Sequence, residues 1–209
     1  MSLFRLATRA ALLAPLLLIA PTAQAGVGDL LVAPTRVVLN GGRGTEIVLS
    51  NIGEDVATYR ISVELRRMTS DGFLHDVTDP NSGEQLAESM IVYAPRRVTL
   101  APREPQTIRI SARAPQGLAD GEYRVHLLFR AVPPPKPVEA PKDVKGISFA
   151  LTPIYGVTIP VIARFGNPQA KASIANAHLT REDGKPAVRV DLTRAGDRST
   201  FGEVRVMKA

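Results

Sequence analysis

The sequence predicts an all-β fold, and three observations support this prediction. Apolar and β-branched residues alternate with polar ones at a period of two, the pattern of a strand with one buried face. Turn signals rich in Gly, Asn, Asp and Pro separate these segments at short intervals. No segment has a convincing 3.6-residue helical period. Strands with this number and spacing are typical of an immunoglobulin-like β-sandwich, here one without cysteine.

Six segments in the first 132 residues have strand character. The clearest is 57–68, in which Tyr59, Ile61, Val63 and Leu65 are expected to point inward. Between the strands, the polar stretch from Thr69 to Glu88 is expected to form a long loop or a weak hairpin. The other five strands are predicted at 30–39, 46–51, 90–102 around Pro95, 106–113 and 121–132.

The stretch 146–165 is the one around which we expect the molecule to be organised. Its apolar residues alternate and then continue as a long run that two prolines interrupt. Because proline lacks a backbone donor, we expect a long apolar edge strand whose free backbone groups are offered to a partner polypeptide. The alternative is an ordinary core strand covered by the protein's own second sheet. The residues concerned are Ile147, Phe149, Leu151, Val157, Ile159 and Val161, with Pro153 and Pro160.

The first 25 residues have the three parts of a secretory signal peptide. A basic start precedes an apolar run that is too short for a membrane span, and Ala23-Gln24-Ala25 is a cleavage site of the A-x-A type. Cleavage after Ala25 leaves 184 of the 209 residues. No second apolar run of membrane length follows, so we expect a bacterial periplasmic protein whose mature chain does not insert into the membrane.

The composition and the motif search exclude several functions. Without Arg5 and Arg9 of the signal peptide, 24 basic residues oppose 20 acidic ones, and the resulting charge of +4 is too dispersed to predict nucleic-acid binding. The three histidines lack metal-ligand spacing, and Ser199 lacks a nucleophile motif. We therefore expect no enzyme activity, catalytic residue, metal or cofactor. The histidines are His75, His178 and His126, of which His126 is expected to be solvated.

The predicted domain boundary lies at Phe165. Residues 26–165 form the predicted N-terminal immunoglobulin-like domain, which ends in the strand 146–165. Only about 40 residues follow, which are too few to bury a core of their own. We therefore expect 166–209 to be a partial C-terminal β domain, with strand candidates at 173–180, 187–194 and 201–208.

Several segments, in the same order and behind a signal peptide, resemble the periplasmic pilus-assembly chaperones with the PapD-like fold. The resemblance covers most of 29–165 and is weaker over 171–208. It is carried by APTRVVL (33–39), YRISVELRRM (59–68), YAPRRVTLAPREPQTIRIS (93–111), LADGEYRVHLLFRAVPP (118–134) and IPVIAR (159–164), with VRVDLTRAGDRSTFGEVRV (188–206) in the tail.

The resemblance implies a role for particular residues. Such chaperones donate the last strand of the first domain to an incomplete subunit, and the donating side chains would be Ile147, Phe149, Leu151 and Pro153. An Arg and a Lys hold the subunit's terminal carboxylate; the Arg position falls on Arg36 and the Lys position on the uncharged Thr158. Anchoring by Arg36 alone, by Arg164 or by a different contact therefore remain alternatives. Family analogy also implies a structural interdomain pair, Arg109 with Glu122.

The implied function is that of a periplasmic chaperone for pilus, fimbrial or similar exported subunits. Its partners would be a pilin-like subunit and an outer-membrane usher, with possible self-association through the edge strand. The short loop 133–145 before the donor strand is similar to that of the short-loop branch. One alternative is a structural or adhesive immunoglobulin-like module without a client. The other is an enzyme, which the motif search disfavours.

Overall fold

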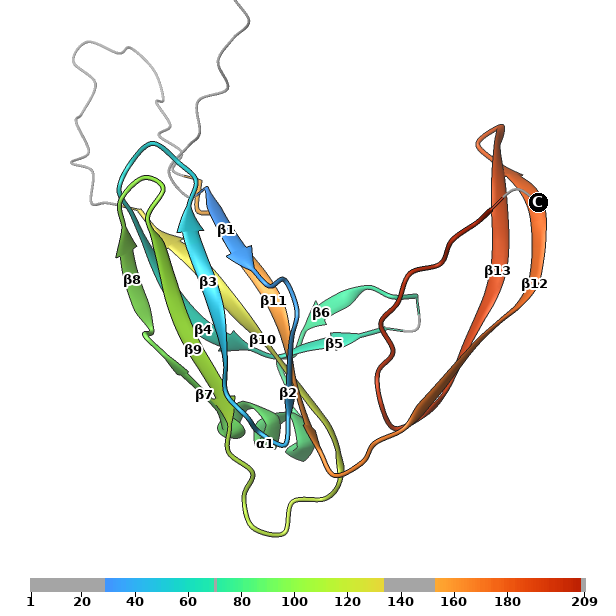
Figure 1. Ribbon diagram of the computed structural model, residues 1–209, viewed down its shortest axis with the longest axis horizontal. Helices are drawn as coiled ribbons and strands as arrows, with labels where there is room; N and C mark the ends of the chain where they lie inside the picture. Colours follow the sequence, from blue (N-terminus) through green and yellow to red (C-terminus); the bar gives the residue numbers. More distant parts are fainter. Residues whose placement is uncertain (1–28, 70, 134–152, 208–209) are drawn as a thin grey trace, which may run out of the picture.

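The computed structural model describes residues 29–69, 71–133 and 153–207, and nine of the described strands form two sheets that pack face to face (Figure 1). This confirms the predicted all-β fold. The first sheet has four antiparallel strands. Their spatial order is β1 (Leu30–Ala33), β3 (Thr45–Asn51), β9 (Pro105–Ala112) and β7 (Ile91–Ala94).

The second sheet has five strands and carries the longest described strands of the sandwich. β2 pairs with its neighbour β11 in parallel, and the other pairs are antiparallel. The spatial order is β2 (Val37–Asn40), β11 (Gly156–Phe165), β10 (Gly121–Val132), β4 (Ala57–Glu64) and β8 (Arg97–Leu100).

The hydrophobic core lies between the two sheets, and alternate residues of both contribute to it. The inward face predicted for 57–68 is confirmed at Tyr59 and Ile61, while Val63 and Leu65 pack partly buried against the core. Burial of this apolar surface is the main source of stability for a chain that has no disulfide. The most buried core side chains include Leu39, Ile47, Leu49, Ile108, Ile110, Leu127, Phe129, Ile159 and Val161.

The chain changes sheets at two prolines, so two predicted strands are each divided in two. The segment 30–39 forms β1 and β2, which belong to different sheets and are separated at Pro34. The segment 90–102 forms β7 and β8, again in different sheets and separated at Pro95. Proline cannot donate to a β ladder, so both positions suit the end of one pairing and the start of another.

The strand β11 is an edge strand over only part of its length. Its last half pairs with β10 on one side and, from Val161 to Arg164, with β2 on the other. The prediction of an edge along all of 146–165 is therefore wrong for this half, because β2 returns from the first sheet to cover it. From Gly156 to Pro160, only β10 pairs with β11 among the described strands.

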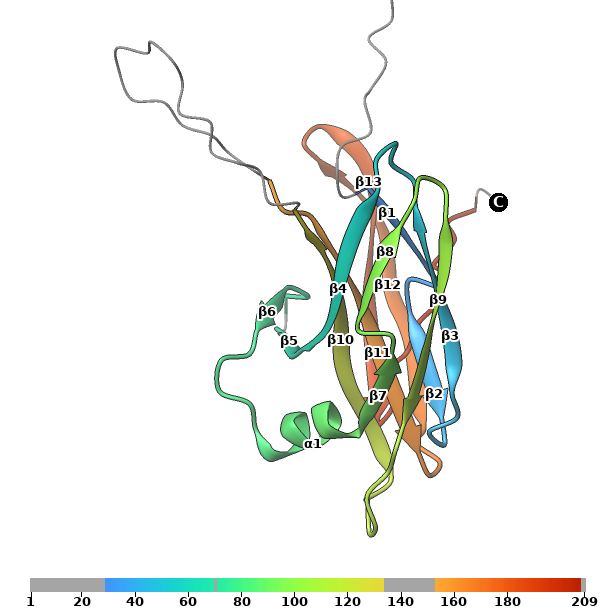
Figure 2. The same ribbon diagram turned by 90° about the vertical axis from the view of Figure 1, so that its left-hand side faces the viewer.

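A short helix, α1 (Ser82–Met90), lies where the sequence indicated a loop or hairpin, so that prediction is wrong here. Its N-terminus has a complete capping box: Asn81 Oδ1 accepts from Glu84 N–H, and Glu84 accepts from Asn81 N–H, each at 2.9 Å. Ala87 and Met90 are buried. Before the helix, a two-stranded hairpin projects from the sandwich (Figure 2), made of β5 (Arg66–Met68) and β6 (Leu74–Asp76).

The C-terminal part forms one long hairpin of β12 (Ala170–Glu182) and β13 (Lys185–Gly196), at the positions of two predicted strands. The hairpin contributes no residue to the described hydrophobic core. The third predicted strand, 201–208, is wrong: its described residues, 201–207, pair with no strand. The segment after β13 instead contacts the sandwich through Ser199 and then runs away from it again (Figure 1).

Candidate functional site

Four residues from distant parts of the sequence meet at one end of the five-stranded sheet. Glu122 lies in β10 and Arg164 in β11, and the strand register places them directly opposite each other. Arg36 immediately precedes β2, and Ser199 belongs to the segment that follows β13. The site is thus built by strand pairing together with the return of the C-terminal segment.

Glu122 is the centre of this cluster. Its Oε2 accepts hydrogen bonds from Arg164 Nε at 3.0 Å, from the Ser199 backbone N–H at 3.0 Å and from Ser199 Oγ at 2.9 Å. Its Oε1 accepts from Arg124 at 3.0 Å. The Glu122 side chain is only 8% exposed, so each of these charge-assisted bonds forms away from bulk water.

The environment of Glu122 holds the carboxylate in its charged form. Burial alone would raise its pKa, but the hydrogen bonds from Ser199, and then those from Arg164 and Arg124, lower the pKa to about 2. A buried charge is tolerated only when it is paired and hydrogen-bonded, and Glu122 meets both conditions. We therefore assign it a structural role that joins β10, β11 and the C-terminal segment.

Arg36 is the cation of the cluster that lacks a carboxylate partner among the described residues. Its guanidinium donates to Ser199 Oγ at 3.2 Å and lies 5.1 Å from the centre of the Phe201 ring. Burial, and then the charges of Arg124 and Arg164, lower the pKa of Arg36, against the opposing effect of Glu122. Arg36 is half-buried in a surplus of positive charge, a setting that favours an anionic ligand.

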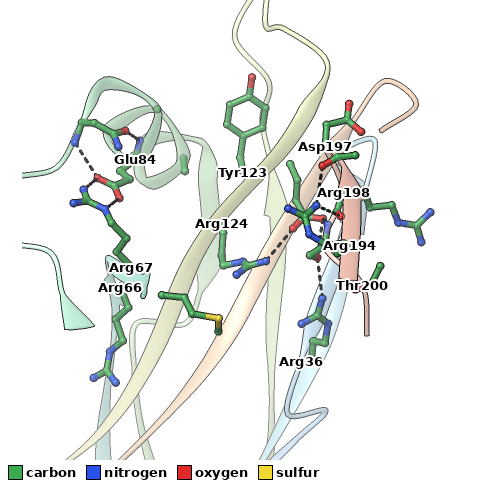
Figure 3. A pocket seen from close by; sticks show the side chains of 17 residues that line it. Arg36, Arg66, Arg67, Glu84, Tyr123, Arg124, Arg194, Asp197, Arg198 and Thr200 are labelled. Carbon is green, nitrogen blue, oxygen red and sulfur yellow. Dashed lines mark hydrogen bonds and ion pairs between the residues drawn. The ribbon is translucent and has the colours of Figure 1, made fainter. Parts of the chain in front are cut away.

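A cleft of about 740 Å³ opens beside this cluster (Figure 3). Its lining comes from three places: the sandwich strands, helix α1 and the segment that follows the hairpin β12–β13. Arg67, on one side, forms a bidentate pair with Glu84 of the helix at 2.9 and 2.7 Å. The helix that the sequence did not predict is therefore part of the cleft wall.

The free half of β11 adjoins Arg36. The parallel pairing of β2 with β11 begins at Val37 opposite Val161, so Arg36 lies one residue before the point at which the second neighbour begins. Pro160, the preceding residue of β11, has no backbone N–H to donate. Within the described part of the chain, the site therefore combines an open strand edge with a cation at the end of that edge.

The structure tests the predicted donor strand only in part. Ile147, Phe149 and Leu151 lie outside the described residues. Pro153 is described and exposed, and it lies three residues before β11 begins. Thr158 is half-buried within the free half of β11, opposite Leu128 of β10.

The predicted pair of Arg109 with Glu122 does not form. Arg109 lies on β9 of the other sheet, where its nearest acidic partner is Glu46 at 3.7 Å, and both of these side chains are largely exposed. Glu122 instead pairs with Arg164 and Arg124. The sequence analysis missed Arg124 and Ser199 as partners. Arg124 lies two residues from Glu122 on the same face of β10, so the strand alternation could have indicated it, whereas only the return of the C-terminal segment brings Ser199 to the carboxylate.

His126 is buried, so the expectation that it is solvated is wrong. It is 3% exposed on the outer face of the sheet, opposite Glu64 of β4, and its Nδ1 has no hydrogen-bond partner among the described residues. Burial, and then the charges of Arg66 and Arg124, lower its pKa to about 4. The alternation correctly assigned His126 to the outer face, but it did not indicate that neighbouring side chains cover that face.

Residues 29–69, 71–133 and 153–207 contain no group of three or more His, Cys, Asp or Glu side chains arranged to hold a metal ion. They also contain no helix that is both long and apolar enough to cross a membrane.

Comparison with solved structures identifies the fold. A structure of a chaperone–tip adhesin complex of CFA/I fimbriae biogenesis matches with a TM-score of 0.50 and 13% identity, over 81% of this chain and 68% of the other. The sandwich is therefore the all-β fold of the PapD-like fimbrial chaperones. No family model matches the sequence, and neither does any curated protein.

Two further structures are similar at lower scores. The Escherichia coli chaperone DraB has a TM-score of 0.45 and 15% identity, over 86% of this chain and 88% of its own. A Salmonella enterica SafA pilin in complex with the SafB chaperone has a TM-score of 0.45 and 16% identity, over 82% of this chain and 84% of the other.

Proposed function

We propose that this chain is a periplasmic chaperone that binds fimbrial or similar exported subunits through strand addition and delivers them to an outer-membrane assembly platform. The fold supports this proposal at the level of the class of protein. The observation that carries it is the position of Arg36 at the end of the half of β11 that has β10 as its only described neighbour. An open edge binds an extended chain through its backbone, and a cation at one end binds a terminal charge.

The direction of the bound strand follows from the position of β2. A client strand on the free side of Gly156–Pro160 occupies the same side of β11 as β2, but earlier along the strand. If it runs parallel to β11, as β2 does, its carboxyl end points toward Arg36. An antiparallel strand would present its amino end there, and two positive charges would meet. The cation therefore favours a parallel client whose last residue lies beside Arg36.

Arg36 is suited to this role because its present contacts are weak. A hydroxyl oxygen and an exposed aromatic ring provide less stabilisation than a carboxylate, which an arginine can bind through two parallel hydrogen bonds. The alternative anchor, Arg164, is already paired with Glu122. We therefore assign the anchor to Arg36, with Thr158 supplying no charge at the position where the related chaperones carry Lys.

The apolar part of the interaction is assigned to the segment before β11. Ile147, Phe149 and Leu151 would fill the groove that a missing strand leaves in the subunit, with Pro153 at the end of this donating segment. Each fully buried side chain of this kind contributes roughly 1.5–3 kcal/mol. The backbone ladder then gives affinity without sequence preference, and the side chains give selectivity.

A periplasmic pull-down tests the proposal. The tagged wild-type chain should capture a small exported protein in a one-to-one complex, and Leu151→Asp should abolish the capture. Arg36→Ala should weaken it, whereas the control Arg97→Ala, on β8 at the opposite edge of the same sheet, should not. Circular dichroism and thermal unfolding establish that each variant is folded.

The results separate the possible functions. Loss of capture with Leu151→Asp but not with Arg36→Ala would retain strand addition and reject the carboxylate anchor. Absence of any partner for the well-folded wild-type chain would reject the chaperone and favour an adhesive or structural module. Capture of an outer-membrane usher together with the subunit would support delivery to an assembly platform.

A further inference from the structure

The cleft beside Arg36 contains more positive charge than its own carboxylates neutralise. Three carboxylates, those of Glu84, Glu122 and Asp197, line the same space as six arginines (Figure 3). These arginines are Arg36, Arg66, Arg67, Arg124, Arg194 and Arg198.

Half of these arginines already have carboxylate partners. Arg67 pairs with Glu84, and Arg124 pairs with Glu122. Arg66 lies 3.1 Å from Glu64 and 3.3 Å from Asp76. These three contribute to the wall of the cleft but add little unbalanced charge.

The other three arginines form no ion pair with a carboxylate within the described part of the chain. Arg36 contacts Ser199 and Phe201, as described above. Arg194 donates through one nitrogen to the backbone oxygens of Gly196 and Arg198 at 2.8 and 2.9 Å. Arg198 is exposed, and its side chain makes no hydrogen bond in the described structure.

The position of Arg198 is fixed although its side chain is free. Arg194 holds its backbone oxygen, and the next residue, Ser199, is bound to Glu122 through both its N–H and its hydroxyl. Asp197 closes the base of the hairpin by accepting from Gln169 N–H at 2.6 Å. Arg198 also lines, together with Arg36 and Arg164, an adjoining hollow of about 440 Å³. Arg36 and Arg198, neither of which pairs with a carboxylate in the described part of the chain, therefore both line these two hollows.

We propose that Arg198, supported by Arg194, binds an acidic side chain next to the carboxyl terminus of the client, so that the preferred partners are subunits whose last residues include Asp or Glu. This inference rests on the proposed function and extends it, because it names the class of client. A carboxylate is favoured over a nucleic-acid phosphate since the cleft adjoins the free edge of β11, and Tyr123 is the only aromatic side chain among its described lining residues.

The expected effect is on selectivity more than on total affinity. Arg198 is exposed, so water and salt screen its interaction with an anion. Complementary charges at such a rim increase the association rate and discriminate between partners. The backbone of Arg198 is held by Arg194, so its side chain starts from a fixed position. An arginine on a mobile segment would lack this fixed starting point.

Labelled peptides and the full mature chain provide the test. One apolar, alternating ten-residue peptide is made with Ser-Ser or Asp-Glu as its penultimate pair, each as the free acid and as the carboxyl amide. Fluorescence anisotropy at low salt should show the acidic free acid binding roughly three- to tenfold tighter than the neutral one. Arg198→Gln should bring this ratio close to one. The control Arg181→Gln, an exposed arginine at the far end of the same hairpin, should leave it unchanged.

Different outcomes reject different parts of the argument. Equal binding of acidic and neutral free acids by the wild-type chain, with the free acid still preferred over the amide, overturns this inference and retains the anchor at Arg36. If Arg36→Ala leaves the preference for free acid over amide unchanged, the anchor itself is rejected. If inorganic polyphosphate competes with the acidic peptide in the wild type but not in Arg198→Gln, with neutral peptide unaffected, the site is a general anion site and the assignment to a peptide is overturned.

Discussion

Glu122 and Arg164 lie opposite each other on neighbouring antiparallel strands, with 3.0 Å between Oε2 of the glutamate and Nε of the arginine. Their side chains are 8% and 12% exposed. The same carboxylate oxygen also binds Ser199 from the segment beyond the hairpin. One buried acid therefore connects the end of strand β11 to the C-terminal part of the chain.

The first prediction concerns the stability that this acid provides. Glu122→Gln should lower the free energy of unfolding by about 3 kcal/mol, because it leaves the largely buried guanidinium group of Arg164 and the half-buried one of Arg124 without a counter-charge. Urea unfolding measures the change. Glu46→Gln, in the exposed pair with Arg109, is the matched control and should cost less than about 1 kcal/mol. Similar losses for the two variants would contradict a special role for Glu122.

The second prediction is a loss of stability in acid that originates at Glu122. Its pKa is about 2 in the folded chain, below the ordinary value of 4.5, so the unfolded state takes up the proton first. The contribution of Glu122 is therefore complete above pH 4.5 and disappears as the pH falls from 4.5 toward 2. Urea unfolding at several pH values should show this decline in the wild type. The decline should be shallower in Glu122→Gln, and an unchanged slope would count against the prediction.

The third prediction concerns the buried histidine at a higher pH. The pKa of His126 is lowered from 6.5 to about 4, so the unfolded chain becomes protonated at a pH at which the folded chain does not. The contribution of His126 to the free energy of unfolding is therefore complete above pH 6.5, and on the order of 3 kcal/mol of it is lost as the pH falls to 4. In His126→Gln this part of the pH dependence should disappear. His75→Gln changes an exposed histidine and should retain it, and a titration of His126 near 6.5 by NMR would refute the argument.

The fourth prediction concerns the signal peptide expected from the sequence. Intact-mass measurement of the periplasmic protein should give a mature chain that begins at Gly26, because Ala23 and Ala25 supply the small residues that a cleavage site requires. Ala23→Arg should block cleavage and leave the precursor uncut. Gln24→Arg changes the position between the two small residues and should be processed normally. A mature chain that begins at another residue would show that cleavage does not occur after Ala25.

The sandwich could be predicted because its main signal is local. Tyr59 and Ile61 alternate with polar residues within a single strand, so their burial follows from the period of two without knowledge of any other strand. The division of 30–39 into two strands has a local cause as well, at Pro34, but apolar and β-branched residues continue on both sides of it. Which sheet each half joins depends on distant partners and could not be predicted in this way.

The candidate site was only partly predictable because its contacts are distant in sequence. Arg36 was identified through a resemblance, whereas the pairing of Glu122 with Arg164 depends on the register between β10 and β11. Ser199 joins them from a segment that has no strand of its own. The helix α1 was missed because it is short and polar, although Asn81 and Glu84 have the spacing of a capping box.

The place at which β2 begins has a consequence for the range of possible clients. Because β2 covers β11 from Val161 onward, an added strand can extend only as far as Pro160 before it meets the protein's own chain. The carboxyl terminus of the added strand then fixes its register against β11, and the residues along the strand need only be extended and suitably apolar. Under the proposed mechanism, subunits with little sequence in common would bind in the same register, whereas an added carboxyl-terminal tail would shift or exclude a client whose internal sequence is unchanged.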